Sequence, residues 1–286
     1  MVRLNEQEFS DIVLYMRQTY GINLDKKKVL IECRLNRELE RNGCRSFGMY
    51  FEKMKRDKSG RMAEALVMRL TTNFTYFWRE ASHFTLLKDK IFPELFQKQR
   101  GTCNIWCAGC STGEECYTLA MVLNDYAKLG TNMPNVRMLA TDISEEVLAK
   151  ARAGIYPNRE LQQLPEQWQK QYCHREGDDS FGVNEELKRN IRFIKQNLMN
   201  PVTDKYDLIL CRNVMIYFDR ESRKKLVAIL ENCLNPGGYL LIGHAELLSA
   251  SETNLEYKYP AVYKKTEGKE NQSKRRPYGK KDNDCR

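Results

Sequence analysis

The chain has 286 residues, 42% of them hydrophobic, with ten cysteines and a formal net charge of +9. This length suits one large domain and a smaller one. The first residues lack the apolar core of a secretory signal, and no apolar run approaches a membrane-spanning length. We therefore expect a cytoplasmic protein with reduced thiols, which excludes a disulfide framework and membrane insertion. Residues 1–80 and 264–286 each carry a net +5 and the intervening residues −1, which favours an acidic partner bound near the ends.

Short helices are predicted throughout the first 70 residues, and we assign residues 1–72 to an N-terminal helical domain. On the second predicted helix, four cations lie within about 80° of one another at 100° per residue. This cationic stripe is either the solvated face of a surface helix or a docking face for an acidic partner. Its members are Lys27, Arg34, Arg37 and Arg41. The predicted helices are Phe9 to Tyr20, Lys26 to Arg41, Ser46 to Lys55 and Met62 to Leu70.

Strand and helix patterns alternate along residues 101–263, which we assign to a catalytic domain that begins within a linker at 73–100. The alternation predicts an α/β, Rossmann-like fold around a mostly parallel, doubly wound sheet. Ser144 is expected to cap one helix and Gly154 to end it, and Asp219 is expected to cap another. The strand candidates are 103–108, 136–141, 191–196, 206–211 and 239–243, and the helix after Asp219 runs to Cys233, before a stop at Asn235 to Gly238.

Two segments depart from this alternation. Residues 157–190 are less regular and have a glycine-rich turn at their centre, from Gly177 to Gly182. We expect a small inserted hairpin there. Residues 264–286 lack apolar periodicity and are rich in lysine and arginine. That composition predicts a basic, disordered tail.

The segment from Trp106 to Glu115 reads W-C-A-G-C-S-T-G-E-E, an apolar strand pattern followed by a glycine turn and the start of a helix. This arrangement presents backbone amides to a nucleotide-like cofactor. The turn lacks the third glycine of the dinucleotide fingerprint, and Glu114 and Glu115 would repel a pyrophosphate. A cofactor with an adenosine end and a cationic end fits better, and S-adenosylmethionine is such a cofactor.

Three cysteines in the same region allow a second interpretation. Cys103, Cys107 and Cys110 have the C-x3-C-x2-C spacing of radical enzymes that combine an iron–sulfur cluster with S-adenosylmethionine. In a strand, however, Cys103 and Cys107 would lie about 13 Å apart, too far to bind one cluster. We favour buried packing residues.

Polar residues follow three of the predicted strands. Asp142 is placed to accept hydrogen bonds from ribose hydroxyls, and Asn197-Leu198 to border an adenine. After Cys211-Arg212 the chain lacks the Asn/Asp-Pro-Pro-aromatic run that holds an amine substrate. A carboxylate acceptor, already ionised at pH 7, needs no general base. We expect the three histidines to be structural, namely His83, His174 and His244.

Five collinear motifs together resemble the chemoreceptor glutamate methyltransferases, the CheR family of bacterial chemotaxis. The similarity extends from the N-terminal helices to about residue 263. The motifs are T-T-N-x-T-x-F-x-R-E from Thr71, S-T-G-E-E from Ser111, A-T-D-I-S from Ala140, C-R-N-V-M-I-Y-F-D from Cys211, and L-x-P-G-G-Y-L-x-I-G-x-x-E from Leu234.

The resemblance implies an enzyme that methylates glutamates on the helical bundle of a receptor and releases S-adenosylhomocysteine. It implies that Arg79 and Tyr217 form the active site and that Arg34 and Arg37 contact the receptor. In some family members, a small β-subdomain at the position of 157–190 binds a receptor peptide. No metal is needed. The implied cofactor-contacting residues are Asn73, Thr75, Arg79, Glu115, Asp142, Asn197, Leu198, Cys211 and Arg212.

Three other functions compete with this interpretation. A radical enzyme would use the three cysteines, and a nucleic-acid methyltransferase would explain the pI near 9.0. The missing amine-binding run and the nearly neutral central region count against the second, so we expect no nucleic-acid partner. A receptor-binding scaffold without activity would have no use for Arg79, Asp142 and Tyr217.

Overall fold

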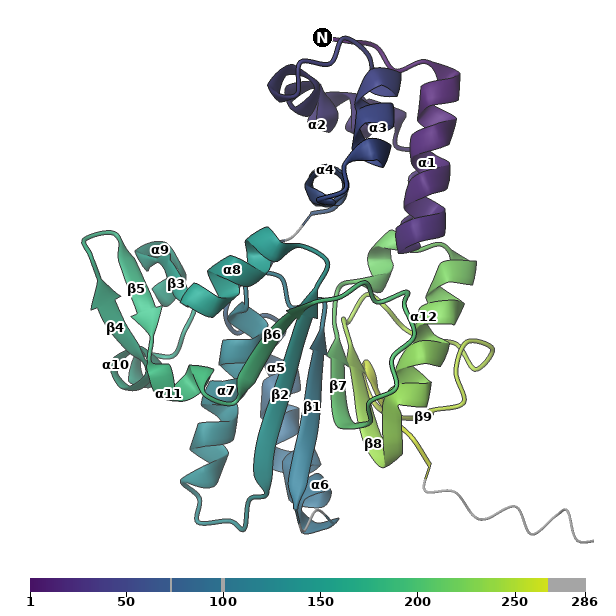
Figure 1. Ribbon diagram of the computed structural model, residues 1–286. Helices are drawn as coiled ribbons and strands as arrows, with labels where there is room; N and C mark the ends of the chain where they lie inside the picture. The colour runs from purple at the N-terminus through teal and green to yellow at the C-terminus, as the bar shows by residue number, and fades with distance from the viewer. Residues whose placement is uncertain (73, 99–100, 267–286) are drawn as a thin grey trace, which may run out of the picture.

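The computed structural model describes residues 1–72, 74–98 and 101–266. Figure 1 shows a helical bundle, formed by the N-terminal part, above a sheet that is flanked by helices. The predicted Asn73 contact and residues 267–286 of the predicted tail lie outside the described residues. The prediction that the tail begins at residue 264 is wrong, because Lys264 ends a strand and Lys265 pairs with Gly237 and Gly238. None of the described helices is both long and apolar enough to cross a lipid bilayer.

The bundle consists of helices whose apolar faces share one core, and each of the four predicted helices is present. Ile31 and Leu35 of α2 and Phe47 of α3 are fully buried in this core. The first helix begins before the predicted Phe9, because Asn5 caps it and exchanges hydrogen bonds with Glu8 in a capping box. The helices are α1 (Glu6–Tyr20), α2 (Lys28–Arg41), α3 (Phe47–Arg56) and α4 (Arg61–Leu70).

The main sheet of the described residues has seven strands in the order β6-β2-β1-β7-β8-β10-β9. The first five are parallel, and β10 and β9 add an antiparallel edge. The predicted α/β class and mostly parallel sheet are therefore confirmed. The strands are β1 (Thr102–Ala108), β2 (Asn135–Asp142), β6 (Ile191–Lys195), β7 (Tyr206–Cys211), β8 (Leu234–Ile242), β9 (Glu256–Tyr259) and β10 (Val262–Lys264).

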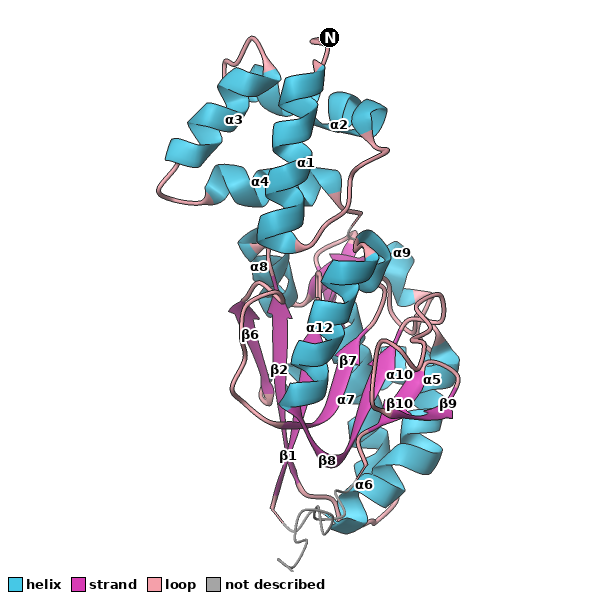
Figure 2. Cartoon of the chain, turned by 90° about the vertical axis from the view of Figure 1, so that its right-hand side faces the viewer, coloured by secondary structure: helices cyan, strands magenta, loops and turns pink. Residues whose placement is uncertain are grey.

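Helices cover both faces of this sheet, because alternate residues of each strand point to opposite faces. Ile105 and Cys107 of β1 pack into one core with α5 (Ala81–Leu86), η1 (Leu87–Ile91), α6 (Phe92–Lys98), α7 (Glu114–Ala127) and α8 (Glu145–Ala153). Trp106 and Ala108 pack into the other core with α12 (Arg220–Cys233). Figure 2 shows α12 lying along its face of the sheet, with the arrowheads of β2 and β6 pointing toward the bundle.

The predicted caps in this domain are correct. Ser144 accepts a hydrogen bond from the amide of Val147 at the start of α8, and Gly154 ends that helix in the left-handed conformation. Asp219 likewise caps α12, which ends at Cys233 as predicted. The predicted strand 239–243 was too short, because Gly237 and Gly238 bond to the backbone of Lys265 and extend β8 back to Leu234.

The segment 157–190 is larger than the predicted hairpin. The hairpin exists as β4 (Cys173–Glu176) and β5 (Ser180–Val183), but β3 (Ile155–Pro157) adds a third strand on the other side of β5. The aromatic rings of Tyr156 and Phe181 pack on Phe77 and attach this small sheet to the main domain. Three helices too short for a clear period complete it, namely α9 (Asn158–Leu161), α10 (Glu166–Tyr172) and α11 (Glu185–Lys188).

Candidate active site

A pocket lies where the helical bundle meets the carboxyl ends of the parallel strands. Its walls enclose about 1030 Å³ of space, the open mouth included. Tyr20 and Val67 contribute from the bundle, and Gly109 from the glycine turn. Residues predicted from widely separated motifs meet in this lining. They are Thr75, Arg79, Glu115, Asp142, Asn197, Leu198, Arg212 and Tyr217.

Cys211 differs from these residues. Its side chain is fully buried in the core under α12, and the residue does not line the pocket. Any contact between Cys211 and a cofactor therefore has to come from its backbone. Its cofactor role stays a prediction, as do the individual roles of the lining residues.

The glycine turn forms the floor of the pocket. Gly109 has a φ of 84°, and a Cβ atom there would lie 2.5 Å from Cγ2 of Val214, so only glycine fits. The carboxylate of Asp142 fixes the turn by accepting hydrogen bonds from the amides of Ser111 (2.9 Å) and Ser144 (3.1 Å). Burial raises the pKa of Asp142, and these backbone hydrogen bonds oppose the rise. The end of β2 and the turn are thus held as one unit.

The two acids after the turn have different surroundings. Glu115 lines the pocket, whereas Glu114 does not and is 4% exposed. The carboxylate of Glu114 accepts a hydrogen bond of 2.7 Å from the hydroxyl of Thr112. Burial raises the pKa of Glu114 to about 7. Of the two acids, only Glu115 therefore faces the pocket, and its contact with a cofactor stays a prediction.

A buried ionic network lies behind Glu115. The guanidinium of Arg212, whose side chain is 1% exposed, donates to Glu115 Oε2 at 2.8 Å and to Glu80 Oε2 at 3.1 Å. It also donates to the carbonyl of Arg79 at 2.5 Å. Burial raises the pKa of Glu115, although Arg212 opposes the shift. Burial also acts to raise the pKa of Glu80, but Arg212 and Asn213 outweigh it and lower the value.

The two residues predicted for catalysis both contact the main chain where the helical domain joins the linker. Nη1 of Arg79 donates to the carbonyl of Phe74 at 2.7 Å. The hydroxyl of Tyr217 donates to the carbonyl of Thr72 at 2.6 Å and accepts from the amide of Thr72 at 3.2 Å. Tyr217 belongs to the 3-10 turn η2 (Met215–Tyr217), which follows β7. Arg79 and Tyr217 therefore share one pocket although 138 positions separate them.

Glu246 holds the loop that carries Tyr217. This carboxylate is 1% exposed and accepts hydrogen bonds from the amides of Asn213 (2.8 Å), Gly243 (2.8 Å) and Ile216 (3.1 Å). Sequence reasoning gave no role to Glu246 or to Glu80, although each closes one of the recognised motifs. An acid that ends a motif rich in apolar and aromatic residues was the available signal for a buried carboxylate with partners.

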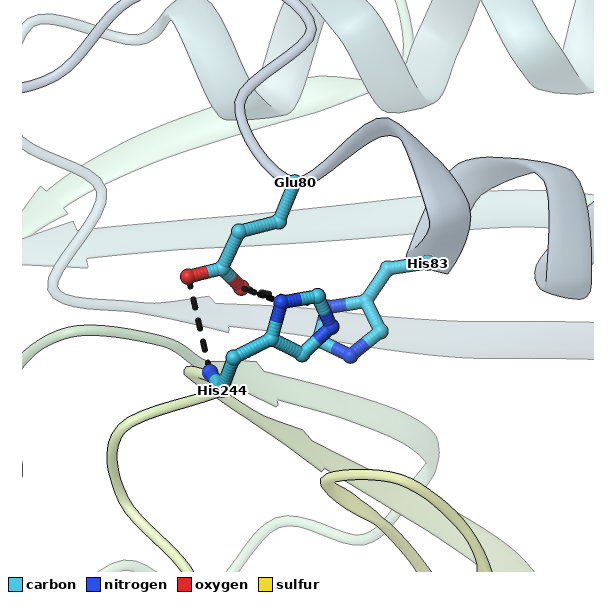
Figure 3. A group of neighbouring side chains, drawn as sticks. All are labelled: Glu80, His83 and His244. Carbon is cyan, nitrogen blue, oxygen red and sulfur yellow. Dashed lines mark hydrogen bonds and ion pairs between the residues drawn. The ribbon is translucent and has the colours of Figure 1, made fainter.

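Glu80 also meets two histidines, as Figure 3 shows. Its Oε2 lies 3.4 Å from Nδ1 of His83 and 3.9 Å from Nδ1 of His244, and the two rings are 4.3 Å apart. Burial, reinforced by the charge of Arg212, lowers the pKa of His83 to about 4, so this ring is neutral at pH 7. The third histidine, His174, lies in the small sheet.

The arginines of the cationic stripe on α2 differ in their contacts. Nη1 of Arg34 donates to the carbonyls of Arg69 (3.2 Å) and Thr71 (3.0 Å), and its Nη2 donates to Oγ1 of Thr72 (3.1 Å). Arg37 is exposed. Arg34 therefore joins α2 to the end of α4 and to the linker.

Two protein-family models match this chain in adjacent ranges. Residues 7–71 match the family described as "CheR methyltransferase, all-alpha domain". Residues 73–263 match the family described as "CheR methyltransferase, SAM binding domain".

Curated relatives match nearly the whole chain. A "Chemotaxis protein methyltransferase" of Borreliella burgdorferi is 41% identical over 272 residues, which cover 92% of this chain and 96% of the relative. A protein of the same description from Escherichia coli is 36% identical, with 91% of each chain covered. Another, from Vibrio parahaemolyticus, is 33% identical, with 89% of this chain and 94% of the relative covered.

Proposed function

The chain belongs to the CheR methyltransferase family, as its motifs indicated, and from this premise we propose that it methylates glutamate side chains of chemoreceptors. It is a chemotaxis methyltransferase that uses S-adenosylmethionine. The proposed products are a glutamate methyl ester and S-adenosylhomocysteine. The setting is the cytoplasm, where the helical signalling bundle of a receptor is accessible.

One observation carries this proposal: a permanently charged arginine and a phenol hydroxyl line the same pocket as two carboxylates. Arg79 and Tyr217 suit an anionic acceptor, whereas Glu115 and Asp142 suit a cofactor with a cationic centre and a ribose. The three described histidines are absent from the lining. This arrangement supports an acceptor that needs no general base.

The residues fit the cofactor at two points. The Arg212 guanidinium and the turn hold Glu115 at the pocket wall, where its carboxylate can attract a sulfonium or ammonium group. Gly109 keeps the turn compact, since a side chain there would collide with Val214. When bound, S-adenosylmethionine supplies an electrophilic methyl group. Asp142, which also lines the pocket, would accept hydrogen bonds from its ribose.

The chain itself supplies position and charge. A glutamate carboxylate has a reference pKa of about 4.3 and arrives ionised. Arg79 binds this carboxylate through its planar fork of N–H donors. Tyr217 would donate a hydrogen bond that orients the attacking oxygen of this carboxylate. Orientation and removal of water from the carboxylate then account for most of the acceleration.

The same proposal gives the bundle its partner. Acidic helices of the receptor would approach the cationic stripe on α2, with Arg34 and Arg37 making the contacts. Each methylation removes one negative charge from a receptor helix and thereby changes the repulsion between neighbouring helices.

Labelled S-adenosylmethionine tests the activity. The protein is mixed with receptor cytoplasmic fragments, and the label that mild alkali releases as methanol is counted. We expect alkali-labile label with the wild-type protein and only background with Arg79→Ala. Label that resists alkali would indicate an N-methylated product and would refute the proposal.

A further inference from the structure

We propose that Glu80, His83 and His244 form a site for one divalent transition-metal ion of the zinc class, next to the cofactor pocket. Each residue offers one ligand atom, and these atoms lie within 4.8 Å of one another. Figure 3 shows the carboxylate and the two rings converging from the start of α5 and from the end of β8. Two imidazoles and one carboxylate are a ligand set that suits Zn²⁺.

The spacing is close to what coordination requires. Oε2 of Glu80 lies 3.4 Å from Nδ1 of His83 and 3.9 Å from Nδ1 of His244. Zinc–ligand bonds of about 2.0–2.1 Å place tetrahedral ligand atoms about 3.3 Å apart. The amide of His83 donates to the carbonyl of Glu80 at 2.9 Å, and Glu80 has a φ of 56°. The backbone therefore sets the first two ligands close together before any ion binds.

His83 provides independent evidence for a ligand. The residue is 2% exposed, the backbone of Pro260 contacts its ring, and its Nδ1 meets only Oε2 of Glu80, at 3.4 Å, without forming a hydrogen bond. Buried polar atoms are almost always paired, so a buried ring nitrogen that faces only a distant carboxylate calls for an explanation. A metal ion on Nδ1 would provide one partner. The side chain of His244 is 44% exposed, which gives the ion a route from solvent and leaves room for a water ligand.

Arg212 is the charge that opposes an ion here. Its Nη2 donates to Oε2 of Glu80 at 3.1 Å, the same oxygen that faces both histidines. An ion on this oxygen would break the bond between Arg212 and Glu80. Arg212 would keep its bonds to Glu115 and to the carbonyl of Arg79. Glu115 lines the pocket and is bonded to Arg212, so an ion at this site would place positive charge close to a cationic cofactor. Metal and cofactor should therefore weaken each other's binding by the same factor.

Cobalt is the probe for the site itself, and this test does not depend on the proposed function. Metal-stripped protein is titrated with Co²⁺ and followed by visible absorption. We expect one bound ion with a spectrum of nitrogen and oxygen ligands, and a loss of affinity of at least about tenfold in His244→Gln. His174→Gln, a change in the hairpin, is the matched control and should bind as the wild type does. Equal affinity in His244→Gln, or a thiolate charge-transfer band, would overturn the proposal.

His244→Gln is the main variant, because a change at this exposed residue should leave folding intact. His83→Gln serves as a second variant, once thermal unfolding shows that the protein carrying it is folded. The coupling is measured by titrating S-adenosylhomocysteine and S-adenosylmethionine with and without Zn²⁺. We expect Zn²⁺ to weaken the binding of S-adenosylmethionine to the wild-type protein and to leave its binding to His244→Gln unchanged. Unchanged cofactor affinity with Zn²⁺ bound would refute the coupling. Metal binding without methyl transfer would leave the site intact and reject only the proposed function.

Discussion

The hydroxyl of Tyr217 donates a 2.6 Å hydrogen bond to the carbonyl of Thr72, the last residue before the linker between the bundle and the catalytic domain. Arg34 of α2 donates to Oγ1 of the same threonine at 3.1 Å. One residue thus connects the proposed docking helix α2 to the proposed catalytic hydroxyl. A receptor helix that binds Arg34 would compete for these contacts, and Tyr217 has to exchange its bond to Thr72 to reach a substrate.

This connection predicts different effects of two neighbouring arginines. Arg34→Ala should weaken receptor binding and also lower kcat, because the linker that positions Thr72 loses its support. Arg37→Ala should weaken receptor binding alone, since Arg37 is exposed and belongs only to the docking face. Calorimetry with receptor fragments and steady-state kinetics measure both quantities. Identical kinetic profiles for the two variants would argue against a connection through the linker.

Arg79 should affect turnover more than cofactor binding. Arg79→Ala removes the fork that holds the acceptor carboxylate, and we expect kcat to fall about a hundredfold or more. Affinity for S-adenosylhomocysteine should change far less, because Glu115, Asp142 and Arg212 remain. Tyr217→Phe, which deletes only the hydroxyl, is the companion variant and should also lower kcat. Wild-type turnover in Arg79→Ala would remove Arg79 from the mechanism.

The close contact at Gly109 predicts that a side chain there lowers cofactor affinity, whereas a side chain at another glycine with positive φ should not. In Gly109→Ala the new Cβ would meet Val214 at 2.5 Å, so the turn must move and cofactor affinity should fall. Gly43 has a φ of 66° with nothing within 4 Å, so Gly43→Ala carries only the backbone strain of about 1 kcal/mol. Calorimetry with S-adenosylhomocysteine compares the two. Equal cofactor affinities would show that the turn tolerates a side chain.

The buried Glu114 should make the free energy of unfolding depend on pH. Burial raises its pKa to about 7 in the folded protein, and the nearby Glu160 adds to the rise, against a model value of 4.5 for the unfolded chain. The protonated form therefore favours folding. Its contribution is complete below pH 4.5 and is lost as the pH rises through about 7. The cost above that pH is roughly 3 kcal/mol.

The variant Glu114→Gln removes this titration. We expect its free energy of unfolding to exceed that of the wild type at pH 8 and to approach it at pH 5, as measured with urea. The exposed Glu186 supplies the control, since Glu186→Gln should follow the wild type at both values. A difference between Glu114→Gln and the wild type that does not change with pH would contradict the assignment.

Local signals in the sequence predicted much of the fold. Ser144 and Asp219 mark helix starts because a cap bonds to residues only three positions away. The fully buried strand β7 and the second half of β8 are nearly continuous apolar runs, as strands covered on both faces require. The third strand of the small sheet and the edge strands β9 and β10 were missed. These strands are three or four residues long, and partners elsewhere in the chain define them.

The residues of the site likewise fall into those with a local signal in the sequence and those without one. The glycine turn and Asp142 were recognisable because they follow strands at fixed spacing. Glu80 and Glu246 were not assigned, because their partners lie far away in sequence: Arg212 is 132 positions from Glu80, and Asn213 is 33 positions from Glu246. A linear pattern also cannot show that Arg34 forms hydrogen bonds with Thr71 and Thr72.

The central claim, methylation of a carboxylate oxygen, is tested most directly by locating the methyl group. A receptor fragment that has been incubated with the protein and S-adenosylmethionine is digested and sequenced by tandem mass spectrometry. We predict one added methylene mass on glutamate residues, lost after mild alkali and absent when Arg79→Ala replaces the wild type. A methyl group on lysine, arginine or another nitrogen, or a glutamate adduct that survives alkali, would contradict the account.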